Sequence, residues 1–152
     1  MHATLIEYRA SCHCGALEAR YRTAVPVSAW SLRACQCDFC RAHGALTTSD
    51  PAGTLAFTAR DTAFLHRYKF GSRMTDFLLC QNCGVYVGAR MEGRGGQFGV
   101  LNTRSLRPIP VGLPEPTLMN YGDEPADLRH ERRETRWTPA SMVFKSSPTI
   151  ST

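Results

Sequence analysis

With 152 residues, the chain is long enough to form one domain with its own hydrophobic core. Hydrophobic residues make up 43% and charged residues 20%, which excludes a disordered chain, and no apolar run approaches the roughly 18 residues of a membrane span. The net charge of +5 comes mainly from scattered arginines. Their densest stretch, 129–136, also contains Glu131 and Glu134, so we predict a solvated face there and expect no nucleic-acid binding.

Short strands separated by turns are the main pattern along the chain. The clearest strand is 16–22, where Leu17, Ala19 and Tyr21 alternate with charged residues, as in a strand with one buried face. The same reasoning predicts further strands, in chain order, over 5–9, 55–59, 64–69, 77–80, 85–89 and 97–101. Many short strands with regular breaks predict a mainly β fold.

The C-terminal third of the chain has a different composition. Four prolines between 108 and 116 predict an extended segment that crosses the surface. Good helix formers after Pro125 predict a short helix over 126–134, and Trp137 is expected to pack the tail onto the sheet. We expect the residues from Ser146 to fray. The prediction is therefore a single domain over 1–152, with 108–152 as a tail packed on it.

Seven cysteines need an explanation in a chain of this size. The N-terminal residues show no basic and apolar signal sequence, so we expect a cytoplasmic protein in a reducing compartment. The odd number of cysteines and their C-x-C and C-x-x-C spacings also argue against disulfides. These observations together favour metal binding, with zinc as the metal.

Two cysteine pairs are each followed directly by a glycine, namely Cys12-His13-Cys14-Gly15 and Cys80-Gln81-Asn82-Cys83-Gly84. Glycine tolerates a positive φ, which lets the backbone turn around a metal ion. Together the two pairs offer four thiolates, the ligand set of a tetrahedral structural zinc. Such a site would join the N-terminal strand to the middle of the chain.

A third group, Cys35-Gln36-Cys37-Asp38-Phe39-Cys40, holds three cysteines within six residues. Three protein ligands leave one position of a tetrahedral ion free, as in catalytic zinc sites. Spacing alone leaves three alternatives open: a tetrad of Cys12, Cys14, Cys37 and Cys40, a closed third group completed by His13, His43 or Asp38, or a single zinc in the whole protein.

Two arginines, Arg33 and Arg41, flank the third cysteine group. A zinc ion with three thiolates carries a net charge near −1, so these guanidinium groups would offset that charge or bind an anionic substrate. Solvated surface arginines are the alternative interpretation. His43 follows the group by three residues and is a candidate for proton transfer during a reaction at the zinc.

In this order, the motifs SCHCGAL, CQCDFCRAHG and LLCQNCGVYVG resemble the glutathione-dependent formaldehyde-activating enzyme family, from about residue 8 to residue 137. The resemblance implies a β-tent of small antiparallel sheets around the zinc-binding cysteines. It also implies a structural zinc on Cys12, Cys14, Cys80 and Cys83, and a catalytic zinc on Cys35, Cys37 and Cys40. The chain departs from the family pattern at Val85, at Ala42-His43-Gly44 and at Arg107-Pro108; these departures spare the cysteines and concern the substrate.

Family members form and cleave carbon–sulfur bonds, typically making S-hydroxymethylglutathione from glutathione and formaldehyde. The resemblance therefore implies a zinc-dependent carbon–sulfur lyase or synthase, with a small thiol and a small aldehyde as partners. A thiol at the free position of the second zinc would ionise and attack the aldehyde carbon. Two other hypotheses stay open: a non-catalytic module with two structural zincs that recognises a protein or nucleic acid, and a zinc or redox buffer.

Overall fold

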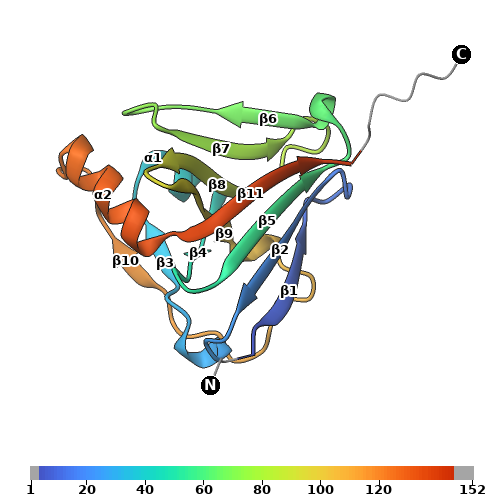
Figure 1. Ribbon diagram of the computed structural model, residues 1–152, viewed down its shortest axis with the longest axis horizontal. Coiled ribbons are helices and arrows are strands. Elements are labelled where there is room, and N and C mark those ends of the chain that lie inside the picture. The colour runs from blue at the N-terminus through green and yellow to red at the C-terminus, as the bar shows by residue number, and fades with distance from the viewer. Residues whose placement is uncertain (1–3, 146–152) are drawn as a thin grey trace, which may run out of the picture.

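Strands dominate the computed structural model, which describes residues 4–145 (Figure 1). The strands are β1 (Ile6–Ser11), β2 (Leu17–Thr23), β3 (Arg33–Cys35), β4 (Thr47–Thr48), β5 (Thr54–Ala59), β6 (Leu65–Tyr68), β7 (Thr75–Cys80), β8 (Tyr86–Gly93), β9 (Gly96–Asn102), β10 (Thr117–Met119) and β11 (Thr138–Phe144). The helices are α1 (Asp38–His43) and α2 (Ala126–Arg136), with 3-10 turns η1 (Val27–Ala29), η2 (Thr62–Phe64) and η3 (Thr103–Ser105). The fray expected from Ser146 lies outside the described residues.

All eleven described strands are connected in one branched sheet. The main path runs β1-β2-β5-β11-β9-β4-β3-β10, and β8, β7 and β6 branch from β9. Within residues 4–145 the pairings are antiparallel except β5 with β11 and β3 with β10. In Figure 1, β1, β2, β5 and β11 lie side by side as one wall, while β6 and β7 form a hairpin across the top.

The mainly β fold predicted from the sequence is confirmed, and each of the seven predicted strands overlaps an observed one. In β2 the alternation is as predicted, because Leu17, Ala19 and Tyr21 are buried while Arg20 and Arg22 are exposed. The short helix after Pro125 is also present and extends to Arg136. The sequence analysis missed the helix α1, the strands β3, β4 and β10 and the C-terminal strand β11.

Buried side chains form two clusters that divide the seven cysteines between them. The first cluster lies between β2 and β5 on one side and β7, β8 and β9 on the other, and includes Cys12 and Cys80. The second joins α1, β7, β8 and β9 to Trp137 at the end of α2, and includes Cys40. Trp137 is 7% exposed, so the C-terminal segment is anchored in this second cluster, as predicted.

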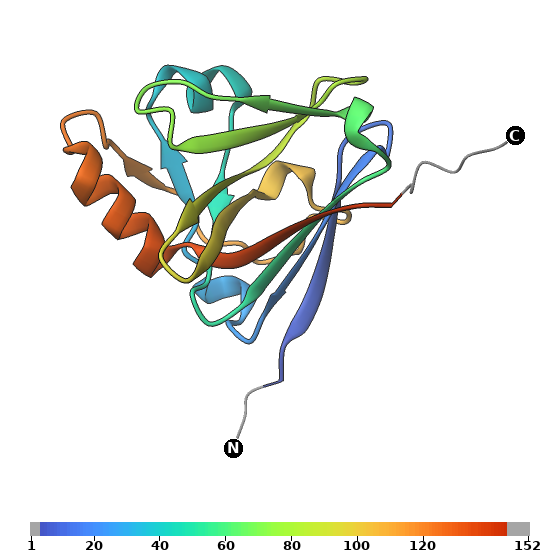
Figure 2. The ribbon, with the colours of Figure 1, turned by 45° about the horizontal axis from the view of Figure 1, so that its top comes forward.

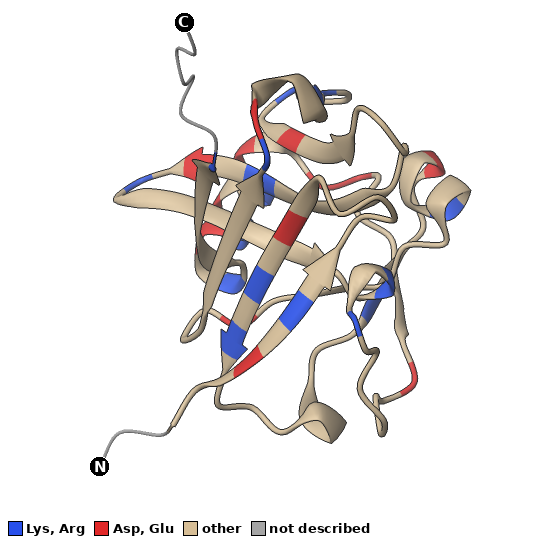
Figure 3. Ribbon diagram, turned by 90° about the vertical axis from the view of Figure 1, so that its right-hand side faces the viewer, with Lys and Arg blue, Asp and Glu red and all other residues tan. Residues whose placement is uncertain are grey.

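Charged residues of both signs are interspersed along β1 and β2 (Figure 3). Glu7 of β1 pairs with Arg22 of β2 at 2.9 Å, and Lys145 pairs with Glu18 at 3.1 Å. Helix α2 lies on the outside of the strand framework, beside β10 and away from β1 (Figures 1 and 2). It thereby covers the part of the molecule that holds the three-cysteine group, Cys35, Cys37 and Cys40.

Candidate metal centres and the adjoining pocket

Two hairpin turns bring four cysteines together. Cys12 and Cys14 lie in the turn between β1 and β2, and Cys80 and Cys83 in the turn between β7 and β8. The four Sγ atoms lie within 4.8 Å of one another. Each pair is followed by a glycine with a positive φ, 87° at Gly15 and 82° at Gly84, as expected for backbone that turns back on itself.

The spacing of these sulfurs fits a tetrahedral ion. The Sγ atom of Cys14 is 3.7 Å from that of Cys12 and 3.6 Å from that of Cys80. A regular tetrahedron with Zn–S bonds of about 2.3 Å has S···S edges of about 3.8 Å. Backbone N–H groups also point at the sulfurs, since Leu17 N donates to Cys12 Sγ at 3.2 Å and Cys83 N donates to Cys80 Sγ at 3.4 Å. This group is able to hold a metal ion.

The other three cysteines surround the start of α1. Cys35 ends β3, Cys37 is the N-cap of α1 and Cys40 lies within the helix, 6% exposed. Their Sγ atoms also lie within 4.8 Å of one another, and no histidine, aspartate or glutamate of residues 4–145 joins them. The structure thus groups the cysteines as four and three, and the alternative tetrad that combines Cys12 and Cys14 with Cys37 and Cys40 does not form.

Hydrogen bonds among the three thiols make them unequal. Contacts with Cys35 and Cys40 lower the pKa of Cys37, and backbone N–H groups of α1 act in the same direction. The same sulfur contacts raise the pKa of Cys40, with burial adding to the effect. Cys37 is therefore the first of the three to become a thiolate, which is the form that binds metal. This group is also able to hold a metal ion.

The three-cysteine group opens into a cavity of about 210 Å³. Phe70, Phe77, Tyr86 and Trp137 contribute apolar and aromatic surface to its walls. Tyr86 is buried, and burial together with the neighbouring thiols raises its pKa well above the ordinary value. The phenol therefore stays protonated at neutral pH. Cavities with mostly apolar walls and a few polar groups are typical of small-molecule sites, and the three cysteines are part of the lining of this one.

Four arginines form the polar side of this cavity, and three of them come from α2. Arg129, Arg132 and Arg133 lie at helical positions i, i+3 and i+4, which places them on one face of the helix. Arg33 joins them from β3. The solvated face predicted for 129–136 is therefore wrong for these three arginines, because that face of α2 covers the cavity.

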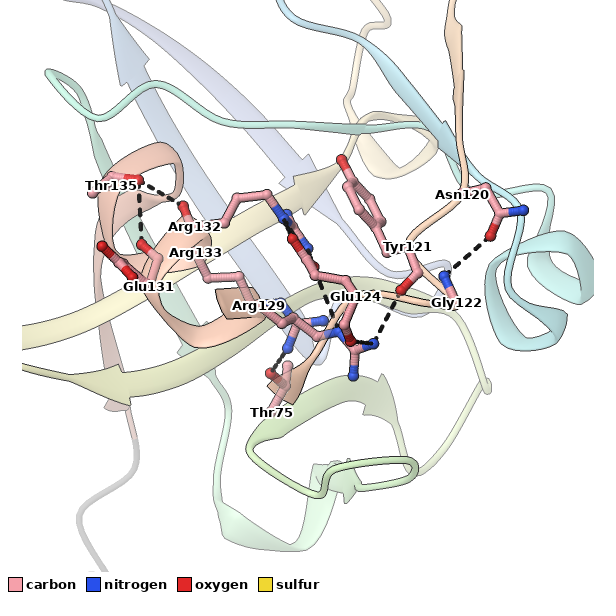
Figure 4. Close-up of polar contacts among 10 residues, drawn as sticks. All are labelled: Thr75, Asn120, Tyr121, Gly122, Glu124, Arg129, Glu131, Arg132, Arg133 and Thr135. Atoms are coloured by element: carbon pink, nitrogen blue, oxygen red, sulfur yellow. Dashed lines mark hydrogen bonds and ion pairs between the residues drawn. The ribbon is translucent and has the colours of Figure 1, made fainter. Parts of the chain in front are cut away.

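The α2 arginines differ in their partners (Figure 4). Glu124 accepts two hydrogen bonds from Arg132 Nε, at 3.0 and 3.2 Å, and one from Arg132 Nη2 at 2.9 Å. Arg129 donates to the backbone oxygens of Tyr121 and Glu124, at 3.0 and 2.9 Å. Arg133 Nη1 instead donates to Thr75 Oγ1 on β7, at 2.6 Å. Arg133 therefore reaches across the cavity to the opposite strand.

The other two residues that the sequence singled out lie outside this cavity. Arg41 and His43 are on the exposed side of α1, and neither lines the cavity. The His43 ring packs on Phe39, with 4.5 Å between ring centroids, and Phe39 in turn contacts Tyr86. Of the flanking residues named from the sequence, only Arg33 lines the cavity. The sequence did not lead us to the arginines of α2, although their i, i+3, i+4 spacing indicates that they share one face of a helix.

Comparison with known proteins assigns the family. A family model described as glutathione-dependent formaldehyde-activating enzyme matches residues 7–108, about two thirds of the chain. The chain belongs to this family. A crystal structure of a Rhodobacter sphaeroides protein is similar in fold, with a TM-score of 0.50, 24% sequence identity, and coverage of 88% of this chain and 99% of that chain. A search of curated proteins found no match.

Two of the departures that the sequence analysis noted lie away from the cavity in this member of the formaldehyde-activating family. Val85 and Arg107, where the chain departs from the family pattern, lie beside the four-cysteine group: Val85 O accepts from Cys80 N at 3.0 Å, and Arg107 Nη2 donates to Cys12 O at 3.4 Å. Neither lines the cavity. Helix α2 and its arginines lie beyond the matched residues 7–108. Neither α-helix in residues 4–145 is long and apolar enough to cross a membrane.

Proposed function

We propose that this protein is a zinc-dependent carbon–sulfur lyase or synthase that adds a glutathione-like thiol to formaldehyde or another small aldehyde. One observation carries the proposal: three cysteine sulfurs, without a fourth side-chain ligand from residues 4–145, face a cavity of about 210 Å³. Three protein ligands and one free position are the arrangement of catalytic zinc sites. Membership of a formaldehyde-activating family supports the choice of substrates.

The two cysteine groups have different roles in this proposal. Cys12, Cys14, Cys80 and Cys83 would hold a structural zinc, because four thiolates at tetrahedral spacing leave no position for a substrate. Cys35, Cys37 and Cys40 would hold the catalytic zinc. When bound there, zinc supplies an acidifying effect on a thiol ligand, which favours the thiolate form at neutral pH.

The reaction breaks two bonds, the S–H bond of the thiol and the π bond of the carbonyl, and forms two, an S–C bond and an O–H bond. The S–H bond of the thiol ionises, the sulfur forms an S–C bond with the aldehyde carbon, and the C=O π bond becomes a hydroxyl that takes up a proton. The reverse sequence is the lyase reaction. Arg33 and Arg133 provide positive charge in the cavity, which stabilises both the thiolate and the developing alkoxide. The aromatic walls exclude water and strengthen this electrostatic effect.

The test is the Cys37→Ser variant with its metal content measured. Cys37 lies in the three-cysteine group, so the variant should keep one zinc per chain and lose the acceleration of adduct formation. Nuclear magnetic resonance exchange of ¹³C-formaldehyde with glutathione measures that acceleration over the uncatalysed background. A variant that holds a single zinc yet retains the wild-type exchange rate would show that the reaction does not take place at this group.

A separate measurement distinguishes this proposal from a purely structural zinc at the three-cysteine group. X-ray absorption at the zinc edge counts sulfur neighbours averaged over both sites. Addition of glutathione should raise that count, because the thiol enters the free position of the second site. An unchanged count would favour the non-catalytic module, in which both sites are complete without substrate.

A further inference from the structure

Two of the cavity arginines have no carboxylate partner among residues 4–145. Arg133 donates only to the Thr75 hydroxyl, its Nε atom is buried without a partner, and its guanidinium carbon is 4.8 Å from the centre of the Trp137 ring. Arg33 donates to the hydroxyl groups of Ser49, at 2.7 Å, and Ser31, at 3.4 Å. Neither arginine forms an ion pair within the described part of the chain.

The charges around the cavity are consequently out of balance. Four guanidinium groups face a single carboxylate, that of Glu124, which is committed to Arg132 and lies 3.7 Å from Arg129 Nε. Three positive charges are left over. A divalent ion held by three thiolates has a net charge of −1, which neutralises one of these three positive charges. Two positive charges then have no anionic partner. A thiolate substrate supplies one negative charge, and a second anionic group supplies the other.

Desolvation makes the imbalance significant. Burial lowers the pKa of Arg133 to about 10, with Arg132 and Arg129 acting in the same direction, so this guanidinium stays charged at neutral pH. A buried charge without a partner is costly, whereas a planar guanidinium with unused N–H donors is suited to bind a carboxylate. The unpaired Nε of Arg133 belongs to a residue that lines the same cavity as the cysteine sulfurs.

We infer that Arg33 and Arg133 bind a carboxylate of the substrate that reacts at the three-cysteine group, so that the enzyme selects acidic substrates over neutral ones of the same size. This inference rests on the proposed function. Arg133 lies on α2, outside the matched residues 7–108, so the family match does not by itself assign it a role. The carboxylate belongs to the thiol or to the aldehyde, and the two sources are separated by experiment.

The experiment measures binding to the zinc-loaded protein by the fluorescence of Trp137, which lines the cavity next to Arg133. The probes are 3-mercaptopropionate and its neutral amide, and, in a second series, glyoxylate and acetaldehyde. A charge-assisted hydrogen bond is worth a factor of about 10 to 100 in affinity. We therefore expect the acid of at least one series to bind about tenfold or more tightly than its neutral counterpart, and that series identifies the source of the carboxylate.

Three variants locate the effect. Arg133→Gln should reduce the preference for the acid over its neutral counterpart to less than about threefold, because it removes the partner of the carboxylate; any weakening of the contact with the thiolate that both thiol probes share cancels in this ratio. Arg136→Gln makes the same charge change on the same helix at an exposed position that does not line the cavity, and should keep the preference. If circular dichroism shows that Arg133→Gln is misfolded, Arg133→Lys replaces it, and an intermediate preference is expected because the charge stays while the paired donors are lost.

The outcomes separate this inference from the proposed function. Equal affinity for acid and neutral probes in both series would overturn the inference, as would a preference that Arg133→Gln and Arg136→Gln reduce equally. Failure of every thiol to bind would instead overturn the proposed function. In that case propionate is the probe, and binding of propionate that is lost in Arg133→Gln but kept in Arg136→Gln would still support the carboxylate site.

Discussion

Replacement of Cys14 by serine tests whether the four-cysteine group acts as a cross-link. The Sγ atoms of Cys14 and Cys80 are 3.6 Å apart, although the residues are 66 positions apart in the sequence. A metal ion that joins them restricts the unfolded chain as a disulfide of the same loop length would, by about 4 kcal/mol at 25 °C. The matched variant Cys37→Ser opens a loop of only three positions, for which the same relation gives about 2 kcal/mol.

The assay is urea unfolding of the zinc-loaded proteins under reducing conditions, followed by circular dichroism, with zinc content measured beforehand. Cys14→Ser should lose about twice as much free energy of unfolding as Cys37→Ser, which at a typical slope of about 2 kcal/mol/M is a midpoint lower by about 2 M than that of the wild type. After removal of zinc by a chelator the three proteins should unfold at similar urea concentrations. A Cys14→Ser protein that binds one zinc fewer yet keeps the wild-type midpoint would refute the cross-link.

Three further predictions concern stability. Gly15→Ala should lower the free energy of unfolding by about 1–2 kcal/mol, because φ is 87° there while no atom lies within 4 Å of the added Cβ; a neutral result in urea would contradict a purely conformational cost. Trp137→Ala should cost about 3–5 kcal/mol in the same assay, since the side chain fills the second cluster, and a loss below 1 kcal/mol would count against that packing. The Arg132 hydrogen bond holds the pKa of Glu124 below its ordinary value of 4.5, so the resulting stabilisation is complete above pH 4.5 and is lost as the pH falls through the lowered value. Glu124→Gln should therefore flatten the acid limb of the stability curve, and an acid limb as steep as that of the wild type would rule out this contribution.

Strand prediction succeeded where a strand is long enough to show its two faces. In β2, seven residues alternate between buried and exposed positions, and the sequence shows that alternation directly. The strands β3, β4 and β10 contain only two or three residues each, which is too short for a period to appear. In β11, Pro139 weakens the strand signal, since proline cannot donate to a ladder; Pro139 lies opposite Phe98 of β9, and the pairing with β5 begins at Ala140.

The candidate site was half visible in the sequence. The closely spaced cysteines are recognisable in the sequence, because local turns at Gly15 and Gly84 and the start of α1 hold the members of each pair or trio together. The meeting of the two pairs, 66 positions apart, depends on the tertiary fold. The polar side of the cavity was hidden, because nothing local shows which surface a distant helix covers. Arg133 reaches the cavity only because α2 packs over β7, 58 positions away in the sequence.

The hairpin of β7 and β8 adjoins both cysteine groups. Its turn carries Cys80 and Cys83, while Phe77, Tyr86 and Ala89 on its strands line the cavity. Oxidation of a turn cysteine would release the clamp that fixes this hairpin and so distort the substrate's binding wall. Damage confined to the four-cysteine group would therefore disturb the cavity at a distance from the residues that contact the substrate.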